Sequence, residues 1–205
     1  MAYVMFRVYS GPGASEIDRI LSLAMKELAL KISEHPGLIR YSPILFSDGR
    51  YGSFSAFHNP EAARRSTQIA AEWVKATAAY QGSKLDELME GEVVYAVQGP
   101  ADKDEGLYAT ARIYRSEAPP AELKAALEGE ADGIVRSLPG LGRYTVAKLT
   151  DGRVGSFSAF DSPEHAKQST EKLGAARAKS GSQLARVLPS DPVVIDGKVL
   201  ATHRG

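Results

Sequence analysis

The spacing of hydrophobic and polar residues changes several times along the first half of the chain. Residues 3–9 alternate in polarity and are rich in aromatic and β-branched side chains, which predicts a strand. Residues 15–33 carry apolar side chains at helical spacing, which predicts a helix that ends before a Pro-Gly pair. Two more strands are predicted over 39–46 and 51–57, joined by a tight turn at Asp48-Gly49-Arg50.

A second helix and a last strand complete this set of elements. Asn59 and Pro60 are typical of a helix start, and the apolar spacing predicts that this helix continues to about Tyr80. Residues 92–98 are predicted to form the last strand. The resulting order, β-α-β-β-α-β, predicts an α+β fold built on a ferredoxin-like unit.

The same pattern then occurs a second time. The stretch DGRYGSFSAF at 48–57 returns as DGRVGSFSAF at 151–160, and 19 of 32 positions are identical between 36–67 and 139–170. We therefore predict tandem ferredoxin-like repeats over 1–98 and 107–205, joined by a polar linker over 99–106. An extended linker of this length spans roughly 25 Å, which lets the two repeats of one chain pack as a pseudo-dimer. A further homodimer is left open.

The first strand is expected to bury its apolar face under the helices. That face consists of Val4, Phe6 and Val8. A sheet face rich in aromatic and charged residues is not normally left bare, so we expect the opposite faces of the two repeats to pack together around a partly polar interior. The candidate ligand-binding residues on these faces are Tyr3, Arg7, Tyr9, Ser53 and Ser55 in the first repeat and Tyr108, Arg112, Tyr114, Ser156 and Ser158 in the second.

The two arginines carry the most chemistry among these candidates. A guanidinium group surrounded by phenols and hydroxyls suits an anionic small molecule such as a carboxylate or phenolate. Alternatively, each arginine is a structural brace paired with carboxylates or carbonyls. Two guanidinium groups in one cavity repel each other unless anions lie between them, and the strands of Arg7 and Arg112 contain no acidic residue. We therefore expect a bound anion, or acidic partners from the helices or loops.

Other residue patterns leave a question open or exclude a class of site. Only one residue of each pair Arg40-Tyr41 and Arg143-Tyr144 can point inward, and the sequence does not decide which. The serines lack an accompanying histidine–acid pair, so they are not catalytic candidates. The chain has no cysteine, and its histidines lack metal-ligand spacing, so we expect no metal site and surface or capping roles for His35, His58, His165 and His203.

The charge balance and the glycine–aromatic strand bear on macromolecular partners. Lys plus Arg and Asp plus Glu each number 25, whereas nucleic-acid binders usually have a basic excess. The strand at 51–57 resembles an RNA-recognition strand, but each of its faces has too few aromatic residues, and RNA binding would require two serines to be buried under the helices. We expect no nucleic-acid or membrane partner. We also expect a cytoplasmic protein, because no signal peptide or membrane-length apolar run is seen.

Two motifs carry a family resemblance. PGLIRY and GSFSAF..PEAA, repeated as PGLGRY and GSFSAF..PEHA, resemble the dimeric α+β barrel superfamily, which includes the antibiotic biosynthesis monooxygenases. The resemblance implies antiparallel sheets packed face to face as a dimeric-type α+β barrel. It also implies a cofactor-independent monooxygenase acting on an aromatic or acidic small molecule, although it assigns no catalytic residue. The alternative is a non-catalytic ligand-binding or assembly protein.

The same resemblance bears on cofactors. Haem-degrading members of the superfamily use a histidine near the end of the second helix and an asparagine on the first strand. Here Trp73 lies on that helix, but no histidine follows it before Gly82, and the strand at 3–9 contains no asparagine. We therefore expect no haem and no other cofactor.

Overall fold

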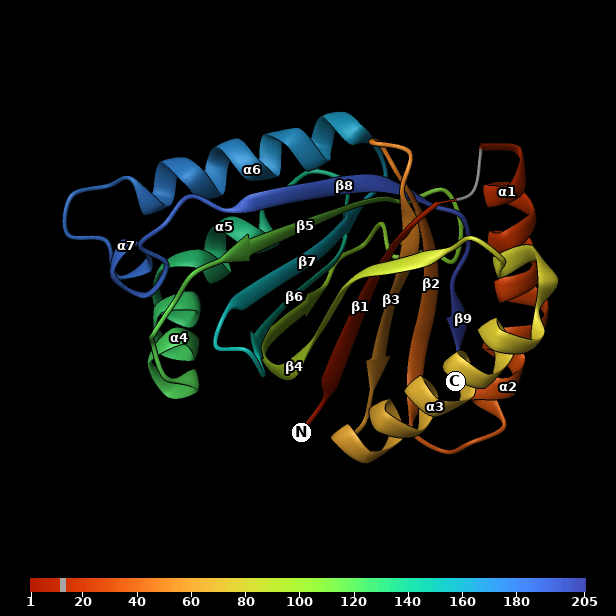
Figure 1. The fold of residues 1–205 in the computed structure, drawn as a ribbon. Helices are drawn as coiled ribbons and strands as arrows, with labels where there is room; N and C mark the ends of the chain where they lie inside the picture. Colours follow the sequence, from red (N-terminus) through yellow and green to blue (C-terminus); the bar gives the residue numbers. More distant parts are fainter. Residues whose placement is uncertain (12–13) are drawn as a thin grey trace. The chain divides into compact units, whose positions relative to one another are not determined.

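The computed structural model describes residues 1–11 and 14–205, with the side chains of all but 14 and 15. The chain divides into two compact units (Figure 1). Unit 1 consists of Met1–Glu92, Asp104–Gly106 and Gly197–Gly205, and unit 2 of Val93–Lys103 and Leu107–Asp196. The boundaries fall within two strands, so that each of these strands begins in one unit and ends in the other: β4 (Lys84–Gln98) and β8 (Val193–Val199).

The sheet of unit 1 is antiparallel. Strand β1 (Tyr3–Ser10) pairs with β3 (Tyr51–Phe57) and with the first part of β4. Strand β2 (Leu38–Phe46) pairs with β3, with the end of β8, and with β9 (His203–Arg204). The first three strands agree closely with the prediction.

The start of β4 was predicted wrongly. The strand begins at Lys84 rather than at residue 92, and Lys84 is already paired with Ser10 of β1. Charged residues dominate this segment, which made it look like a loop. They are tolerated because most of the segment is at least partly exposed.

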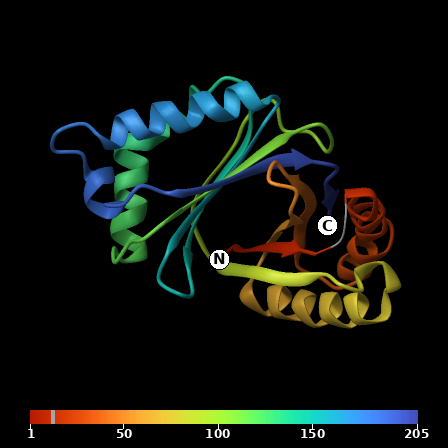
Figure 2. The same ribbon diagram turned by 45° about the horizontal axis from the view of Figure 1, so that its top comes forward.

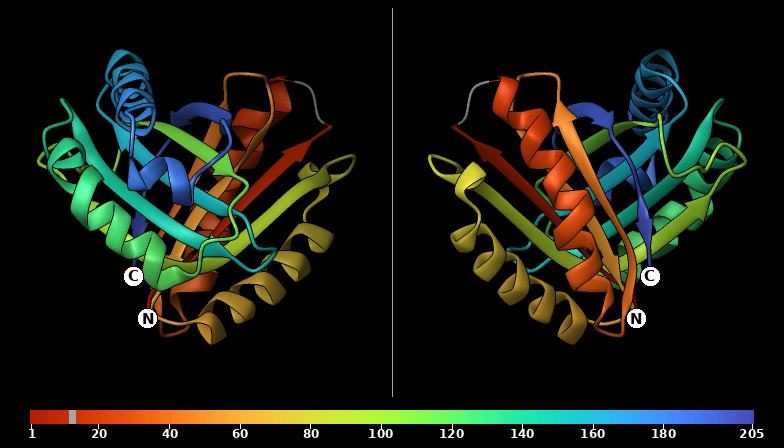
Figure 3. Two further views of the ribbon diagram at one scale, coloured as in Figure 1. Left: turned by 90° about the vertical axis from the view of Figure 1, so that its left-hand side faces the viewer. Right: turned by 90° about the vertical axis from the view of Figure 1, so that its right-hand side faces the viewer.

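The helices of unit 1 lie together on one side of its strands (Figures 2 and 3). The first helical stretch is continuous, and consists of α1 (Ala14–Leu23), a π-helical turn η1 (Ala24–Leu28) and α2 (Ala29–Ser33). The second is α3 (Pro60–Ala76), followed by a short 3₁₀ turn η2 (Ala78–Tyr80). As predicted, Asn59 caps α3: its side chain accepts a hydrogen bond from the backbone N–H of Ala62 at 2.9 Å.

Unit 2 has the same order of elements. Strand β5 (Tyr108–Tyr114) pairs with β7 (Val154–Phe160), and β7 pairs with β6 (Leu141–Leu149). The end of β4 lies beside β6, and the start of β8 lies beside β5. The helices are α4 (Pro120–Ala126), the π-helical turn η3 (Leu127–Ala131), α5 (Asp132–Arg136), α6 (Pro163–Arg177) and α7 (Gln183–Val187).

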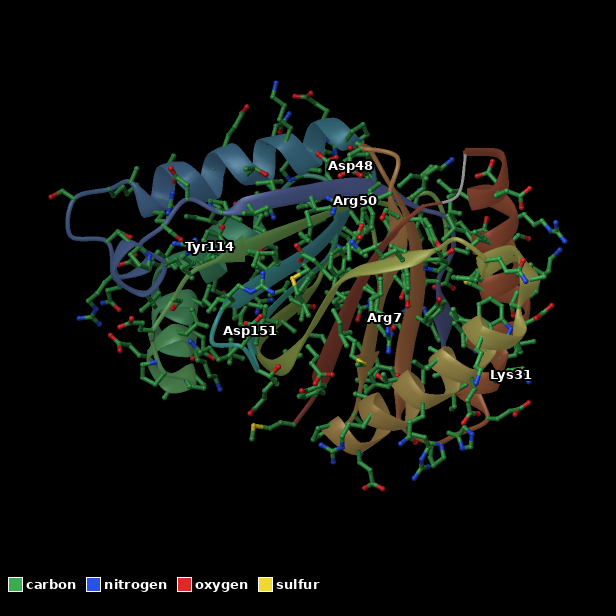
Figure 4. The ribbon with its side chains drawn as sticks, viewed as in Figure 1. Arg7, Lys31, Asp48, Arg50, Tyr114 and Asp151 are labelled. Atoms are coloured by element: carbon green, nitrogen blue, oxygen red, sulfur yellow. The ribbon has the colours of Figure 1, made fainter. Side chains whose placement is uncertain are left out.

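The two hairpin turns have the structural role that the sequence predicts. The Asp48 carboxylate accepts hydrogen bonds from the backbone N–H of Arg50 at 3.0 Å and from its Nε at 2.8 Å, and Asp151 binds Arg153 with the same two distances. Gly49 and Gly152 have φ angles of 84° and 89°, which favour glycine. Figure 4 shows both aspartates at the tips of their hairpins. These repeated residues therefore shape turns.

Candidate functional site

The helices of unit 1 cover the opposite face of the sheet from the one predicted. The Arg7 side chain points toward α3, where its Nη2 donates a hydrogen bond to the Thr67 hydroxyl at 3.0 Å (Figure 4). The ring of Phe6 points to the other face and lies 5.6 Å from the ring of Phe46, centroid to centroid. The prediction that the apolar face of this strand meets the helices is therefore wrong.

The reason is that both faces of β1 are buried. Met5 on one face is 0% exposed and Phe6 on the other is 2% exposed, so the polar positions do not mark a solvent side. The helix layer accommodates the polar face because α3 carries hydroxyl groups above it. Alternation predicted the strand correctly but could not tell which face the helices cover.

This correction also removes one argument against RNA binding. Ser53 and Ser55 lie under the helices, which is the arrangement that the sequence argument considered too costly. On the other face, the rings of Phe6 and Phe54 are only 2% and 9% exposed, so they offer bases no stacking platform. The absence of nucleic-acid binding stays a prediction that depends on the balanced charge.

A small cavity lies between the sheet and the helices of unit 1. Its floor comes from β1, β2 and β3, and its cover from α1, η1, α3 and η2. The volume open to the centre of a water molecule is about 10 Å³, so the cavity has room for about one water. Its lining consists of Arg7, Tyr9, Leu21, Leu28, Tyr41, Tyr51, Gly52, Ser53, Ala70, Val74 and Tyr80.

Tyrosine rings form one wall of this cavity. Tyr9 and Tyr51 stack with their centroids 5.5 Å apart, and the ring of Tyr80 meets both edge-on at 6.3 and 6.2 Å. Trp73 packs against Tyr80 at 5.1 Å, and its indole N–H donates to the Glu27 carboxylate at 2.9 Å. Glu27 lies in the π-helical turn η1, so this irregular turn helps to hold the aromatic wall in place.

Arg7 is the charged group of the cavity. Its side chain is almost fully buried, at 4% exposure. In the part of the chain that the structure describes, its hydrogen-bond partners are the Thr67 hydroxyl and the Met5 sulfur, the latter at 3.4 Å, and both contacts use Nη2. Among those same residues, Nε and Nη1 have no acceptor, and no carboxylate pairs with the guanidinium group. A buried positive charge therefore keeps part of its hydrogen-bonding capacity unused.

The phenols around Arg7 stay neutral. Burial raises the pKa of Tyr41 to about 12, against the opposing effects of Arg7 and of a hydrogen bond with Ser53. Burial likewise raises the pKa of Tyr9, and Arg7 again opposes the shift. At neutral pH the cavity therefore offers one positive charge and neutral hydroxyl groups, which suits a guest that is negatively charged and accepts hydrogen bonds.

Arg112, the equivalent residue in unit 2, is saturated by hydroxyl groups. Its Nη1 donates to Ser158 at 3.0 Å and its Nε to Thr170 at 3.1 Å. Its Nη2 donates to Ser169 at 2.5 Å, to Thr170 at 2.6 Å and to the backbone carbonyl of Ala166 at 3.4 Å. The acidic partners that we expected are not the groups that bind it.

The expectation of one shared cavity is also wrong. Arg7 bonds to α3 of unit 1, and Arg112 bonds to α6 of unit 2. Each arginine is bonded to hydroxyl groups of its own unit.

The predicted candidates do not all gather at the cavity. Arg7, Tyr9 and Ser53 line it, whereas Tyr3 and Ser55 do not. Sequence reasoning missed Tyr51 and Tyr80 as lining residues. A usable signal for Tyr51 was the difference between the repeats, because Val154 takes its place in unit 2.

The remaining unit 2 candidates are buried or bonded locally. Burial raises the pKa of Tyr114 to about 12, and the Tyr108 hydroxyl donates to Asp196 at 3.0 Å. Ser158 accepts from Arg112, and Ser156 is 2% exposed. Nothing in these contacts brings the unit 2 candidates to an open site.

The structure settles which member of each Arg-Tyr pair faces the helices. Tyr41 and Tyr144 belong to the cores under the helices of their units. Arg143 instead forms an ion pair with Asp102 at 3.2 Å. It is therefore Tyr41 that joins the cavity next to Arg7.

Histidines contribute no visible metal centre. His165 Nδ1 lies 2.6 Å from the Asp161 carboxylate at the start of α6, where both side chains are partly exposed. Across residues 1–11 and 14–205, no three His, Cys, Asp or Glu side chains come together in a way that could hold a metal ion. Within the same residues, no helix has the length and apolar character needed to cross a membrane.

Comparison with known proteins identifies the fold. No protein-family model and no curated protein matches the sequence. An anthrone oxidase-like protein matches the structure with a TM-score of 0.64 at 15% identity, over 99% of this chain and 93% of that one. A proposed monooxygenase from Fusobacterium nucleatum gives 0.71 at 11% identity, over 99% and 94%. A chlorite dismutase from Candidatus Nitrospira defluvii gives 0.63 at 12% identity, over 96% and 90%.

These likenesses concern the fold alone, because the sequence identities are so low. All three proteins have the dimeric α+β barrel fold. The chain described here is likewise an antiparallel α+β protein of this fold. They therefore assign no activity to the cavity of unit 1.

Proposed function

We propose that unit 1 binds a small aromatic anion, a phenolate or an aryl carboxylate, in the cavity at Arg7. The observation that carries this proposal is the Arg7 guanidinium group, which is buried at 4% exposure and bonded through Nη2 to a hydroxyl and a thioether. Burying a charge without full compensation is costly. An anion that accepts hydrogen bonds from Nε and Nη1 would supply the missing partner.

The tyrosine wall explains the choice of an aromatic guest. Tyr9, Tyr51 and Tyr80 present ring faces and edges to the cavity. The cavity holds only about one water, so a ring-sized guest needs one lining residue to move. Tyr80 is the residue that we propose moves, because it lies on the short 3₁₀ turn η2 rather than within a strand or a long helix. The ring of the guest then takes its place beside Tyr9 and Tyr51.

The finer proposal is oxygenation without a cofactor. It is supported by structural neighbours described as anthrone oxidase-like and as proposed monooxygenases. In such a reaction the substrate supplies the electrons. A CH₂ group between aromatic rings loses a proton to give an enolate-type anion, which gives one electron to dioxygen, and the resulting radical and superoxide combine to form a C–O bond. The peroxide anion takes up a proton, and loss of water from the hydroperoxide leaves a ketone, so that CH₂ and O₂ become C=O and H₂O.

Arg7 has a defined role in this scheme. Its positive charge favours the anionic form of the substrate, and only this form readily gives an electron to dioxygen. Neutral Tyr41 and Ser53 orient the anion by hydrogen bonding. The alternative is a non-catalytic binding protein, in which the same groups hold an aromatic anion that is not oxidised.

A dye titration tests the binding proposal. Para-nitrophenol absorbs visible light only as its phenolate, so binding next to Arg7 at a pH just below the pKa of the free dye should increase the yellow absorbance. Arg7→Met removes the charge at similar side-chain length and should abolish this increase. Arg112→Met is the matched control and should leave it unchanged. Equal absorbance changes in the two variants and the parent would overturn the proposal.

A second assay separates oxygenation from simple binding. The protein is mixed with a hydroxylated anthrone in air, and oxygen uptake and anthraquinone formation are followed together. Equal amounts of both, lost in Arg7→Met, support the oxygenase. Dye binding without oxygen uptake supports the non-catalytic binding protein.

A further inference from the structure

The two arginines have equivalent acceptors available. Arg7 lies opposite Ser53 in the β1–β3 pairing, and Arg112 lies opposite Ser156 in the β5–β7 pairing. Each helix above them carries a Ser-Thr pair in the same place, preceded by an alanine carbonyl that accepts from both hydroxyls. The pairs are Ser66-Thr67 and Ser169-Thr170. The hydroxyl set therefore cannot by itself explain why one guanidinium group is saturated and the other is not.

The structure shows which acceptors Arg7 leaves unused. Ser158 and Ser169 both accept hydrogen bonds from Arg112. Their counterparts in unit 1 do not bind Arg7. The Ser55 hydroxyl is fully buried and has no hydrogen-bond partner in the described part of the chain, and Ser66 donates to the Ala63 carbonyl at 2.8 Å and to the Met5 sulfur at 3.7 Å.

The Met5 sulfur lies between Arg7 and the Ser66 hydroxyl. It lies 3.4 Å from Arg7 Nη2, 3.6 Å from the Thr67 hydroxyl and 3.7 Å from the Ser66 hydroxyl. In unit 2, Arg112 Nη2 itself contacts Ser169 and Thr170. The sulfur therefore takes the place that a guanidinium nitrogen has in unit 2. A thioether is a weak acceptor, so this contact does little to satisfy the charge.

The position equivalent to Met5 is occupied by a shorter residue in unit 2. Thr110 pairs with Ser158 just as Met5 pairs with Ser55. Its side chain is too short to reach between the arginine and the helix. We infer that Met5 is a positioning residue that keeps Arg7 available to an aromatic anion, an inference that rests on the proposed function. The shorter Thr110 leaves Arg112 free to bond with Ser158, Ser169 and Thr170 of its own unit.

This inference also narrows the ligand class. Among the described residues that line the cavity, Arg7 is the only positively charged one, and the free edge of its guanidinium group consists of Nε and Nη1. A monoanion whose oxygen lies in the plane of its ring matches that edge. A dianion would bring a second negative charge into a buried space without a partner.

Substitutions of Met5 test the inference while Arg7 is kept. In Met5→Thr, Arg7 should turn to Ser55 and Ser66, and the affinity for para-nitrophenolate should fall by about tenfold or more, since the ligand then competes with internal hydrogen bonds to a charged group. Met5→Leu keeps the bulk and removes the sulfur, so its affinity should stay within about threefold of the parent. If Met5→Thr does not fold, Met5→Ala opens the same space and should show the same loss.

A crystal structure of Met5→Thr, or of Met5→Ala, separates this inference from the proposed function. We expect Arg7 Nη2 at hydrogen-bond distance from the Ser66 hydroxyl, whether or not any dye binds. If the parent protein fails to bind para-nitrophenolate but the arginine turns as expected, the proposed function fails and the role of Met5 stands. An arginine that stays away from the Ser66 hydroxyl and keeps Thr67 as its one hydroxyl partner, or a variant that binds the dye as tightly as the parent, would overturn the inference.

Discussion

Two equivalent glutamates, one in each unit, support different structures. Glu27 and Glu130 both lie in the π-helical turn of the first helical stretch. Glu27 accepts from the Trp73 indole, next to Tyr80. Glu130 accepts from the Ser182 hydroxyl and from the backbone N–H groups of Gln183 and Leu184, at the start of α7. One carboxylate therefore helps to hold an aromatic wall, and the other holds an extra helix.

The consequence is a difference in how the space under the helices is used. In unit 2, Leu184 and Val187 of α7, and Leu188 directly after it, join the core that contains Tyr114 and Tyr144. In unit 1 the corresponding segment is the short turn ending at Tyr80, and a cavity lies beside it. The comparison teaches that the segment after the second helix, rather than the repeated strand motif, decides whether a small cavity is left between the sheet and the helices of a unit.

The largest expected effect comes from breaking the filled core of unit 2. Leu184 is 3% exposed, so Leu184→Ala should lower the free energy of unfolding by about 3 kcal/mol through lost burial and the cavity left behind. Urea unfolding followed by circular dichroism would measure this loss. Leu85→Ala serves as a control, because Leu85 is 46% exposed and its truncation should cost far less. Equal costs would show that α7 does not fill the core.

The second largest effect distinguishes the two arginines by how much each contributes to the free energy of unfolding. Arg112→Met removes the donor to Ser158, Ser169 and Thr170, and should lower the free energy of unfolding by about 2 kcal/mol. Arg7→Met relieves a buried and poorly compensated charge, so its cost should stay below about 1 kcal/mol. Urea unfolding of both variants checks this order. The reverse order would make Arg7 the structural brace and Arg112 the better binding candidate.

Alkaline pH should weaken unit 1 through its buried tyrosines. Burial raises the folded-state pKa of Tyr41 from 10.0 to about 12, so the unfolded chain loses this proton first and stability falls as pH rises through that window. The contribution of Tyr41 to stability is fully present below the pKa that this residue has in the unfolded chain. Tyr41→Phe should reduce the loss by about 1 kcal/mol for each pH unit above about 10.

The measurement uses a built-in reporter. Trp73 is the only tryptophan in the chain and belongs to unit 1, so its fluorescence reports on that unit. Urea titrations at about pH 9 and about pH 11 bracket the start of the window. A variant that weakens with pH as steeply as the parent would mean that other groups cause the loss.

The smallest effect concerns the tether of the aromatic wall. Glu27→Gln keeps the size of the side chain but weakens its hydrogen bond with the Trp73 indole, so we expect a loss of about 0.5 kcal/mol, because Glu27 is exposed. Glu16→Gln, elsewhere on the first helix, is the control. The Trp73 emission should shift in Glu27→Gln and stay unchanged in Glu16→Gln. Identical spectra for Glu27→Gln and the parent would mean that the Glu27 carboxylate does not position the Trp73 ring.

Much of the fold could be predicted from the sequence, and less of the site. The hairpin turns at Asp48 and Asp151 and the cap at Asn59 depend on local chemistry, which a sequence displays directly. The choice of the sheet face that the helices cover does not depend on local chemistry alone, because polar residues can be buried where a helix provides hydroxyl groups as hydrogen-bond partners. Thr67 and Thr170 were a usable signal, since a hydroxyl repeated on the inner side of a helix can receive a buried arginine.

The role of Tyr80 could not be predicted in the same way. It lies outside the repeated motif, and it reaches the cavity only because the chain ends α3 at Ala76 and turns back into β4. The contacts of the Met5 sulfur with Arg7 and Ser66 could not be predicted either. Both depend on tertiary packing that no spacing rule contains.

The division of β4 and β8 between the units has a consequence for synthesis on the ribosome. The outer edge of β2 pairs with residues 197–199 and with β9, which emerge more than a hundred residues later. Until then, a nascent chain that has already formed the β2–β3 hairpin exposes an unpaired strand edge, which is a template for misassembly with a neighbouring chain. Slow translation of residues 107–205, or a chaperone that covers this edge, would therefore change the yield of folded protein without changing its final stability.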